Sequence, residues 1–350
     1  IVHGIPGERK LNKDDLISID CGAIVGGMYS DHARTFIIAE IGINHNGSFQ
    51  KCLNMIKLAS KSGADAVKIQ TINVDESYHK SSRSYQVFKN KDFSLLQIKQ
   101  LKRFSKKMGL IFFSTPGDIS SLKKIMKAKI SLIKISSGLL TNIPLIKASI
   151  KKNHPIILSS GMASYKDLSE TIKFIRRNSN SEICVLKCTS LYPPKDNMLN
   201  LNAINFLAKK YKVVPGYSDH TSDILAPVIA VAKGAKVIEK HFKISNKDNC
   251  PDKKISLDPS EFKKMSIQIR RAEQMFGIDR IKPNLGELKV KKKIYRYIFT
   301  RKNIFKGEKL KLEDLVYKRS NFKIQKVEPK YYKKFINKIA KKNISKNKPL

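Results

Sequence analysis

The sequence has few cysteines and no long apolar run. Its cysteines are odd in number, and no two of them are separated by two residues: Cys21, Cys52, Cys184, Cys188 and Cys250. This pattern argues against a disulfide framework or a zinc-binding cysteine cluster, and it favours a reducing, cytoplasmic compartment. No apolar run reaches the length of a transmembrane helix, and no basic-then-apolar leader opens the sequence. We therefore expect no membrane association.

Acidic residues are also scarce. Asp and Glu number 29 against 69 Lys and Arg, which gives a formal net charge of +40 at pH 7. A charge of this size is typical of proteins that bind nucleic acid or membrane surfaces. The lysines, however, are spread over nearly every segment, are not interleaved with aromatic residues, and accompany an enrichment in Ile and Asn. We attribute the charge to coding bias and do not expect nucleic acid as a partner.

What the chain does contain is a regular alternation of two kinds of segment. At 350 residues it is long enough for two domains, one of them large. The apolar, strand-like segments are FIIAEIG, AVKIQT, LIFFSTP, LIKISSG, PIILSSG, ICVLKCTS, KVVPGYSDH and KVIEKHF. The helix-like segments are residues 49–61, 94–108, 119–128, 143–151, 165–177, 201–210, 224–233 and 259–276. Strands that each precede a helix over roughly 240 residues predict a (β/α)8 TIM barrel.

Two histidines lie at the ends of neighbouring predicted strands. Residues 213–242 read as strand, helix and strand, so the two strands must be parallel and must end at one edge of the sheet. His220 follows the first strand and His241 ends the second. Two imidazoles at that edge could hold a divalent metal ion. A pair of hydrogen-bonded strand-end histidines is an equally good interpretation of the two residues alone.

Period-two alternation places polar side chains inside the predicted barrel. Glu40, Lys68 and Lys134 face inward from three strands, and Glu239 shares a face with His241. A lysine within an apolar strand is costly unless it meets an anion. With nearby hydroxyls, the two lysines predict a pocket for a small molecule that carries phosphate and carboxylate groups. Each hydroxyl alone could simply be a strand-end hydrogen-bonding group; they belong to Thr115, Ser137, Ser159 and Ser218.

A series of motifs resembles the sialic acid synthase family: FIIAEIGINHNGS, GADAVKIQT, FFSTP, KISSG, PIILSSGM, CTSLYP, GYSDHT, GAKVIEKHF and SLDPSEF. They span residues 36–276, and the tail is similar to that family's antifreeze-like (SAF) domain. The resemblance implies a barrel followed by a small β-rich SAF domain. It also implies condensation of phosphoenolpyruvate with N-acetylmannosamine or a related 2-acetamido sugar, giving a nonulosonic (sialic) acid and phosphate.

The same resemblance implies roles for individual residues. His220 and His241 would bind Mn²⁺ or another divalent cation, which polarises the sugar aldehyde. Arg319 would enter the active site of the partner subunit, which implies a homodimer with swapped C-terminal domains. The candidate catalytic residues are Glu40, Lys68 and Lys134. The residues expected to hold phosphoenolpyruvate are Lys68, Gln70, Thr115, Lys134, Ser137, Ser159, Ser218 and Ser190, the last standing where many members have asparagine. Those expected to contact the sugar are Glu40, Tyr192 and Asp252.

The sequence departs from the family at two places. Leu139 follows the SSG motif where the family has a glutamate beside the sugar aldehyde. We therefore expect slow rather than absent catalysis, because leucine can neither orient the aldehyde nor relay a proton. In the tail, Ser320 and Asn321 replace the Pro-Gly pair that follows the arginine in the family. This second departure bears on the placement of Arg319.

Residues 1–35 resemble the middle of a type I methionine aminopeptidase. In that family the residue matching His3 contacts substrate, and those matching Asp20 and Asp31 bind paired metal ions. The other ligands of that site have no counterpart in this sequence, so we expect this fused or mis-joined fragment to be inert as a peptidase. Its segments LISID and AIVGGMYSDHARTF predict a β-hairpin. The expected division is 1–35 for this fragment, 36–278 for the barrel, 279–293 for a basic linker and 294–350 for the SAF-like domain.

Two other functions remain open on the sequence. A class I pyruvate aldolase would use Lys68 or Lys134 to form a Schiff base, and it would need no metal ion. A degenerate barrel would bind a sugar acid or nucleic acid without turnover. Borohydride trapping without a metal ion would indicate the aldolase. Ligand binding without turnover, or nucleic-acid binding with a steep salt dependence, would indicate the degenerate barrel.

Overall fold

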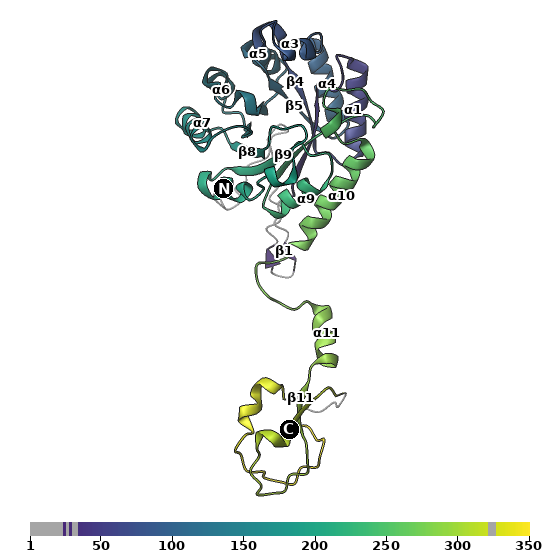
Figure 1. Cartoon of the computed structure of the whole chain (residues 1–350), viewed down its shortest axis with the longest axis vertical. Coiled ribbons are helices and arrows are strands. Elements are labelled where there is room, and N and C mark those ends of the chain that lie inside the picture. The colour runs from purple at the N-terminus through teal and green to yellow at the C-terminus, as the bar shows by residue number, and fades with distance from the viewer. Residues whose placement is uncertain (1–23, 26–27, 30–33, 321–326) are drawn as a thin grey trace. The chain divides into compact units, whose positions relative to one another are not determined.

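The computed structural model describes residues 24–25, 28–29, 34–320 and 327–350. The chain divides into two compact units, residues 1–277 and residues 278–350 (Figure 1). Each unit is described by itself. Among the described residues, no helix combines the length and the apolar character that a membrane span requires.

The first unit is a closed barrel of parallel strands in the order β10-β3-β4-β5-β6-β7-β8-β9. The barrel closes where β10 pairs with β3, with Val237 opposite Phe36. The (β/α)8 fold predicted from the alternation of segments is therefore confirmed. The strands are β3 (Phe36–Gly42), β4 (Ala66–Thr71), β5 (Ile111–Pro116), β6 (Ile133–Ile135), β7 (Ile156–Ser159), β8 (Ile183–Cys188), β9 (Val214–Asp219) and β10 (Val237–His241).

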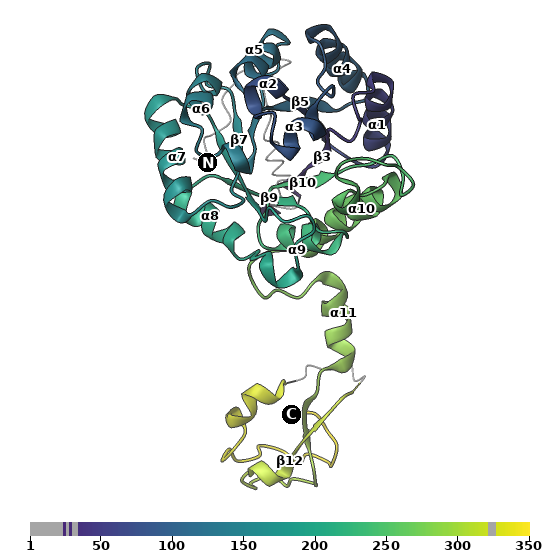
Figure 2. The ribbon, with the colours of Figure 1, turned by 45° about the horizontal axis from the view of Figure 1, so that its top comes forward.

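A ring of helices surrounds the strands (Figure 2). Side chains at the helix starts cap free backbone N–H groups, as Ser94, Ser164 and Asp258 do in three capping boxes. The helices that follow the strands are α1 (Phe49–Lys61), α4 (Leu95–Lys107), α5 (Ile119–Lys127), α6 (Ile143–Ser149), α7 (Tyr165–Asn178), α8 (Ala203–Tyr211), α9 (Leu225–Ala232) and α10 (Pro259–Met275). The sequence pattern missed the short α2 (Val74–Ser77) and α3 (Arg83–Phe88), and it missed the 3₁₀ turns η1 (Ser137–Leu139), η2 (Asp196–Met198) and η3 (Lys253–Ile255).

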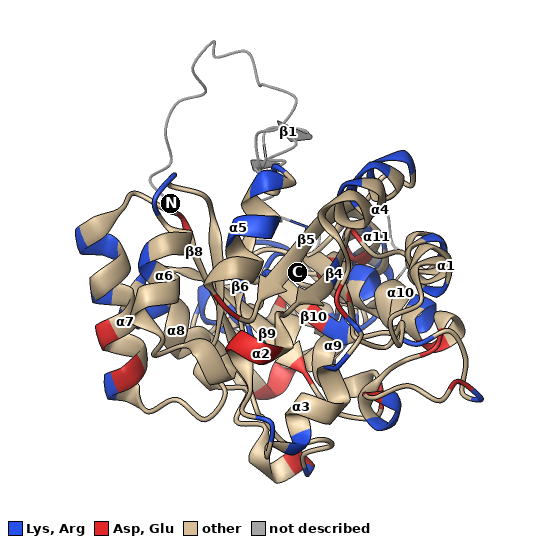
Figure 3. Cartoon of the chain, turned by 90° about the horizontal axis from the view of Figure 1, so that it is seen from above, with Lys and Arg blue, Asp and Glu red and all other residues tan. Residues whose placement is uncertain are grey.

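The apolar core lies between the strands and these helices. Ile37, Val67 and Ile69 are fully buried there, which explains why the strands are near-continuous apolar runs. Burying such side chains contributes roughly 25 cal/mol per Å² of apolar surface. Lys and Arg are spread over several of the outer helices, among them α1, α4, α5 and α6 (Figure 3). The packing of this core holds the strands in place, and with them the polar residues at the strand ends that form the site described below.

The described part of the N-terminal fragment contains two short strands. β1 (Ile24–Val25) pairs antiparallel with β2 (Met28–Tyr29). Both strands fall within AIVGGMYSDHARTF, the segment that the sequence predicts to be β-like. The LISID segment, His3, Asp20 and Asp31 lie outside the described residues, so the predictions that concern them stay predictions.

The second unit begins with a helix that the sequence pattern missed. α11 (Leu285–Ile294) occupies most of the segment predicted to be a linker, and it starts with a capping box between Asn284 and Glu287. β11 (Tyr297–Thr300) then pairs antiparallel with β12 (Leu315–Lys318), and the turns η4 (Leu312–Asp314) and η5 (Pro329–Lys334) complete the named elements. A small apolar cluster holds the unit together: Ile298, Ile304, Leu310, Leu315 and Ala340. Its likeness to an SAF domain stays a prediction.

Candidate active site

The carboxyl ends of parallel strands open at one end of a barrel, where barrel enzymes hold their active sites. Inward-facing polar side chains from five strands gather toward that end inside this barrel. They come from β3, β4, β6, β9 and β10, and they are almost completely buried. The residues are Glu40, Lys68, Lys134, Ser218 and Glu239.

Lys68 lies between the two carboxylates of this cluster. Its Nζ is 2.5 Å from Glu40 Oε2 and 3.7 Å from Glu239 Oε2, and it donates a hydrogen bond of 3.0 Å to Thr115 Oγ1. Burial alone would lower the pKa of Lys68, but Glu239 and Glu40 together raise it. The ammonium group is therefore stabilised in its charged form.

Glu239 holds the second lysine. Lys134 Nζ donates to both carboxylate oxygens, at 2.9 and 3.0 Å, and Ser218 Oγ donates to Oε1 at 2.9 Å. Burial disfavours the charged form of Glu239, but Lys134 and Lys68 outweigh it and hold the pKa of this carboxyl well below its usual range. The sequence predicted that two buried lysines would need an anion beside them. The Glu239 carboxylate of the protein itself supplies part of that negative charge.

Glu40 is shifted in the opposite direction. Burial raises the pKa of its carboxyl above the usual value, Lys68 opposes this effect, and the neighbouring charge of Glu239 adds to it. Two carboxyls whose pKa values are pushed apart can serve as an acid and a permanently ionised partner. Glu40 is therefore the group of this pair that can hold or give up a proton.

Two predicted hydroxyls, those of Ser137 and Ser190, lie close to Gly161, and a third, that of Ser159, is two residues before it in the chain. Gly161 N donates to Ser137 Oγ at 3.0 Å, and a Cβ on Gly161 would come within 2.2 Å of Ser190 Oγ. Gly161 is thus the residue whose lack of a side chain leaves room for both hydroxyls. Ser159 Oγ is buried and has no hydrogen-bond partner among the described residues. A buried hydroxyl without a partner is a candidate contact for a ligand.

The two histidines approach each other at the ends of β9 and β10. The ring centroids of His220 and His241 are 5.3 Å apart, with the planes at 60°. The ring of Tyr192 stacks on the ring of His220, with the two centroids 4.2 Å apart, and about half of the Tyr192 surface is exposed. Asp252 Oδ2 lies 3.1 Å from His241 Nδ1. Burial would raise the pKa of Asp252, but His241 lowers it overall.

The surroundings of these rings fit a metal ion. His220 Nδ1 is 2.9 Å from the carbonyl oxygen of Thr189, which can only accept, so this nitrogen carries the proton. His241 Nδ1 faces the Asp252 carboxylate, although the geometry is not that of a hydrogen bond. Metal-binding histidines usually present their second nitrogen to a carbonyl or carboxylate in this way, leaving Nε2 for the ion. Within the described ranges no group of three or more His, Cys, Asp or Glu could hold a metal, so further ligands would have to be water or substrate oxygens.

The other predicted residues lie as follows. Gln70 is half-buried on the same strand face as Lys68, and it is opposite Thr115 in the β4–β5 register. Leu139 ends η1 and packs, half-buried, against the barrel's apolar core. Arg319 is exposed, one residue beyond β12 in the second unit, and its expected role stays a prediction.

Glu239 is the residue whose importance the sequence pattern underestimated. Its inward orientation followed from its spacing to His241, but its simultaneous contact with Lys134, Lys68 and Ser218 depends on four strands. Only the closed barrel brings those strands together. Cys188 was missed as well: its Sγ lies 3.8 Å from His220 Nδ1.

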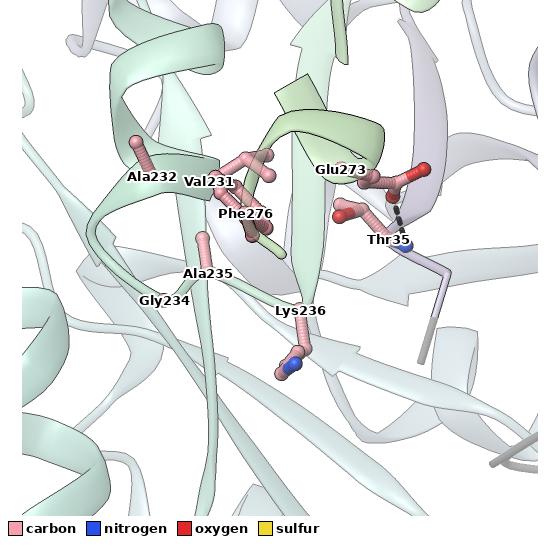
Figure 4. A pocket seen from close by; sticks show the side chains of 8 residues that line it. All are labelled: Thr35, Val231, Ala232, Gly234, Ala235, Lys236, Glu273 and Phe276. Atoms are coloured by element: carbon pink, nitrogen blue, oxygen red, sulfur yellow. Dashed lines mark hydrogen bonds between the residues drawn. The ribbon is translucent and has the colours of Figure 1, made fainter. Parts of the chain in front are cut away.

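A separate cavity of about 160 Å³ lies where β3 and β10 begin. Figure 4 shows the hydrogen bond from Thr35 N to Glu273 Oε1, 2.5 Å long, at its edge. Because Thr35 and Lys236 directly precede β3 and β10, the cavity belongs to the amino ends of the strands. It is therefore distinct from the candidate active site. The lining residues are Thr35, Val231, Ala232, Gly234, Ala235, Lys236, Glu273 and Phe276.

Comparisons with known proteins agree with the barrel fold. Residues 55–280 match the model of the NeuB family, and residues 1–94 match the model of metallopeptidase family M24 over a range that overlaps it. The chain is 36% identical over 299 residues to the N,N'-diacetyllegionaminic acid synthase of Legionella pneumophila, covering 80% of this chain and 84% of that protein. It is 31% identical over 270 residues to the human N-acetylneuraminate-9-phosphate synthase, covering 73% and 74%. A solved structure of the N-acetylneuraminic acid (sialic acid) synthetase from Leptospira borgpetersenii superposes with a TM-score of 0.71 at 30% identity, covering 78% of this chain and 96% of that one.

Proposed function

Because the chain belongs to the NeuB family, we propose that it is a synthase that condenses phosphoenolpyruvate with an open-chain 2-acetamido sugar. The products are a nonulosonic acid and phosphate. The observation that carries the proposal is the cluster of Lys68, Lys134, Glu40 and Glu239 beside the histidine pair. The named relatives support it, because one is an N,N'-diacetyllegionaminic acid synthase and the other an N-acetylneuraminate-9-phosphate synthase.

In this proposal the two lysines and the hydroxyls hold phosphoenolpyruvate. Lys68 and Lys134 offer ammonium groups to the phosphate and carboxylate, and Ser159 offers a buried hydroxyl that has no other partner within the described structure. Charge-assisted hydrogen bonds of this kind are stronger than neutral ones. Preorganised cations also stabilise the charge that develops as phosphate leaves.

Bond formation joins C3 of phosphoenolpyruvate to the aldehyde carbon of the sugar. Water then adds at C2, and phosphate leaves with cleavage of its C–O bond. Glu40, with its raised pKa, can hold the proton that the aldehyde oxygen requires. Tyr192 stacks on His220 and Asp252 contacts His241, and both would position the sugar.

His220 and His241 would hold a divalent cation such as Mn²⁺. When bound, the cation would act as a Lewis acid on the sugar aldehyde. The residues of this chain contribute to the orientation: the Thr189 carbonyl accepts a hydrogen bond from Nδ1 of His220, and the Asp252 carboxylate lies 3.1 Å from Nδ1 of His241. Arg319, in the second unit, would complete the site from the partner subunit of a swapped homodimer.

The class I aldolase is the weaker candidate. A Schiff-base lysine must be neutral to attack a carbonyl, but Lys68 has a raised pKa and Lys134 binds both oxygens of Glu239. The raised pKa of Lys68 favours its ammonium form, and Lys134 Nζ is occupied by the Glu239 carboxylate. Borohydride in the presence of pyruvate should therefore fail to inactivate the protein, and inactivation without a metal ion would reverse the assignment.

The proposal is tested by a phosphate-release assay with phosphoenolpyruvate, Mn²⁺ and a panel of acceptors. The panel should contain N-acetylmannosamine and a 2,4-diacetamido hexose. The names of the two relatives specify one product with a single N-acetyl group and one product with two. Release that requires one of these sugars supports the proposal. Absence of release with every acceptor, in folded protein loaded with metal, contradicts it.

A further inference from the structure

A buried ion pair lies directly behind the two histidines. Asp219 precedes His220, and Lys240 precedes His241. The side chains of Asp219 and Lys240 are both 0% exposed and form an ion pair, and the two residues are opposite each other in the β9–β10 register. Because Glu239 faces the inside of the barrel, its neighbour Lys240 faces the helices on the outside. The pair therefore joins the two strands on the face that substrate does not reach.

This ion pair also ties down the turn that follows β9. Lys240 Nζ donates to the backbone oxygen of Thr221 at 2.6 Å, in addition to its contact with Asp219. The Asp219 carboxylate accepts hydrogen bonds from Thr221 N at 3.1 Å, from Thr221 Oγ1 at 2.9 Å and from Tyr217 OH at 3.0 Å. His220 lies between the two residues that are held in this way. Its backbone is consequently fixed relative to β10, which carries His241.

Stability alone is a poor explanation of such a pair. Desolvation of two charges largely offsets their attraction, and apolar residues of similar volume often stabilise a protein equally well. The surrounding outer face of the barrel is apolar: Ile238, two residues before Lys240, is fully buried. What apolar residues could not supply is a donor that reaches the Thr221 carbonyl and an acceptor for the Thr221 amide.

We propose that Asp219 and Lys240 are positioning residues that set the separation and orientation of His220 and His241 for a divalent cation. The inference rests on the proposed function in that it takes these histidines as the metal-binding pair. Neither Asp219 nor Lys240 contacts the ion or the substrate. They act through the backbone on both sides of His220 and on the amino-terminal side of His241.

The test compares three variants. The double variant Asp219→Asn/Lys240→Met removes both charges together, so no unpaired charge stays buried, and the asparagine keeps an oxygen for Tyr217 and the Thr221 amide. The single variant Lys240→Met leaves the Asp219 charge buried and should lose much more thermal stability. The control is Arg270→Met, which breaks a partly buried contact of 2.9 Å to Asp65 at the other end of the barrel.

Three measurements are made on each full-length protein: the melting temperature, Mn²⁺ affinity by titration, and hydrogen exchange of the amides of residues 219–221. The double variant should melt close to the wild type, bind Mn²⁺ about 10- to 100-fold more weakly, and lose protection at the Thr221 amide. Arg270→Met should lose stability but keep its Mn²⁺ affinity.

The outcomes separate the inference from the proposed function. A folded double variant with wild-type Mn²⁺ affinity and wild-type protection of Thr221 overturns the positioning role, while the proposed function stands. If the wild type itself binds no Mn²⁺, the metal assignment falls and the inference falls with it, whatever phosphate release shows. If Arg270→Met weakens Mn²⁺ binding as much as the double variant does, the effect is general destabilisation, and the inference is again wrong.

Discussion

The two units of the chain use charged residues in opposite ways. In the barrel, the ion pairs of Lys68, Lys134 and Lys240 have side chains that are at most 4% exposed. In the second unit, the pair Lys311–Glu313 is largely exposed, and Lys302, itself 54% exposed, pairs with the half-buried Glu308 and the buried Asp314. Solvent and salt screen exposed pairs, so they contribute little. Buried pairs impose geometry and are costly to break, and in this protein they surround the candidate active site.

The largest effect on activity is expected from the histidine pair. His220→Ala or His241→Ala should abolish Mn²⁺-dependent turnover, because each removes a proposed ligand at a strand end. The fold should persist, since neither change opens the apolar core. Activity is measured after chelator treatment and reloading with Mn²⁺, with circular dichroism to check folding. Wild-type rates in either variant would show that the metal assignment is wrong.

The largest effect on stability is expected from a matched pair of substitutions, one in a buried ion pair of the barrel and one in a more exposed ion pair of the second unit. Glu239→Gln leaves Lys134 with an uncompensated buried charge, and it should lower the free energy of unfolding by ~3–5 kcal/mol. Glu308→Gln, in the more exposed pair, should leave that free energy almost unchanged. Urea denaturation of both variants measures the difference. Equal losses would remove the distinction between the units.

The same pair of variants gives a pH prediction. The pKa of Glu239 in the folded protein lies below its ordinary value of 4.5. The contribution of this carboxylate to stability should therefore be fully present above that value and should be lost as the pH falls below it. The stability difference between the wild type and Glu239→Gln should shrink in acid. A difference that stays constant from neutral pH to pH ~3 would contradict the assigned ionisation of Glu239.

These buried contacts also mark the limit of what the sequence could predict. Period-two alternation correctly placed Lys68, Lys134 and Glu239 on inward faces, because each strand is apolar and its register follows from the pattern. It could not predict that Glu239 binds both lysines, since that depends on which strands become neighbours and how far each is staggered. The helix α11 was not predicted, because its run of lysines resembles a solvated linker. Its capping box between Asn284 and Glu287 is a local signal in the sequence that would have indicated a helix start.

A smaller effect concerns the cooperation of the units. Arg319→Ala should lower activity, and mixing this variant with barrel-inactive His241→Ala should restore part of it. In the mixed dimer one barrel is intact and receives an intact arginine from the partner subunit. Activity is measured after subunit exchange has been demonstrated with differently tagged chains. No recovery despite exchange would count against the swapped arrangement.

The smallest expected effect is a gain. Leu139 is half-buried at the end of η1, at the position where the family resemblance implies a glutamate. Leu139→Glu should raise kcat several-fold, within the range of positioned acid–base groups, with little change in the binding of phosphoenolpyruvate. Leu139→Gln is the control that adds polarity without a titratable group. An unchanged or lower rate in folded Leu139→Glu would indicate that Glu40 already supplies the proton.

The central claim is that the buried cluster in the barrel catalyses carbon–carbon bond formation with loss of phosphate by C–O cleavage. The most direct measurement uses phosphoenolpyruvate whose bridging oxygen is isotopically labelled, with Mn²⁺ and the acceptor sugar. The account predicts that the label leaves in the phosphate, that its release requires the sugar, and that Glu239→Gln suppresses it. Label retained in pyruvate or in the sugar acid, or released without any sugar, would contradict the account.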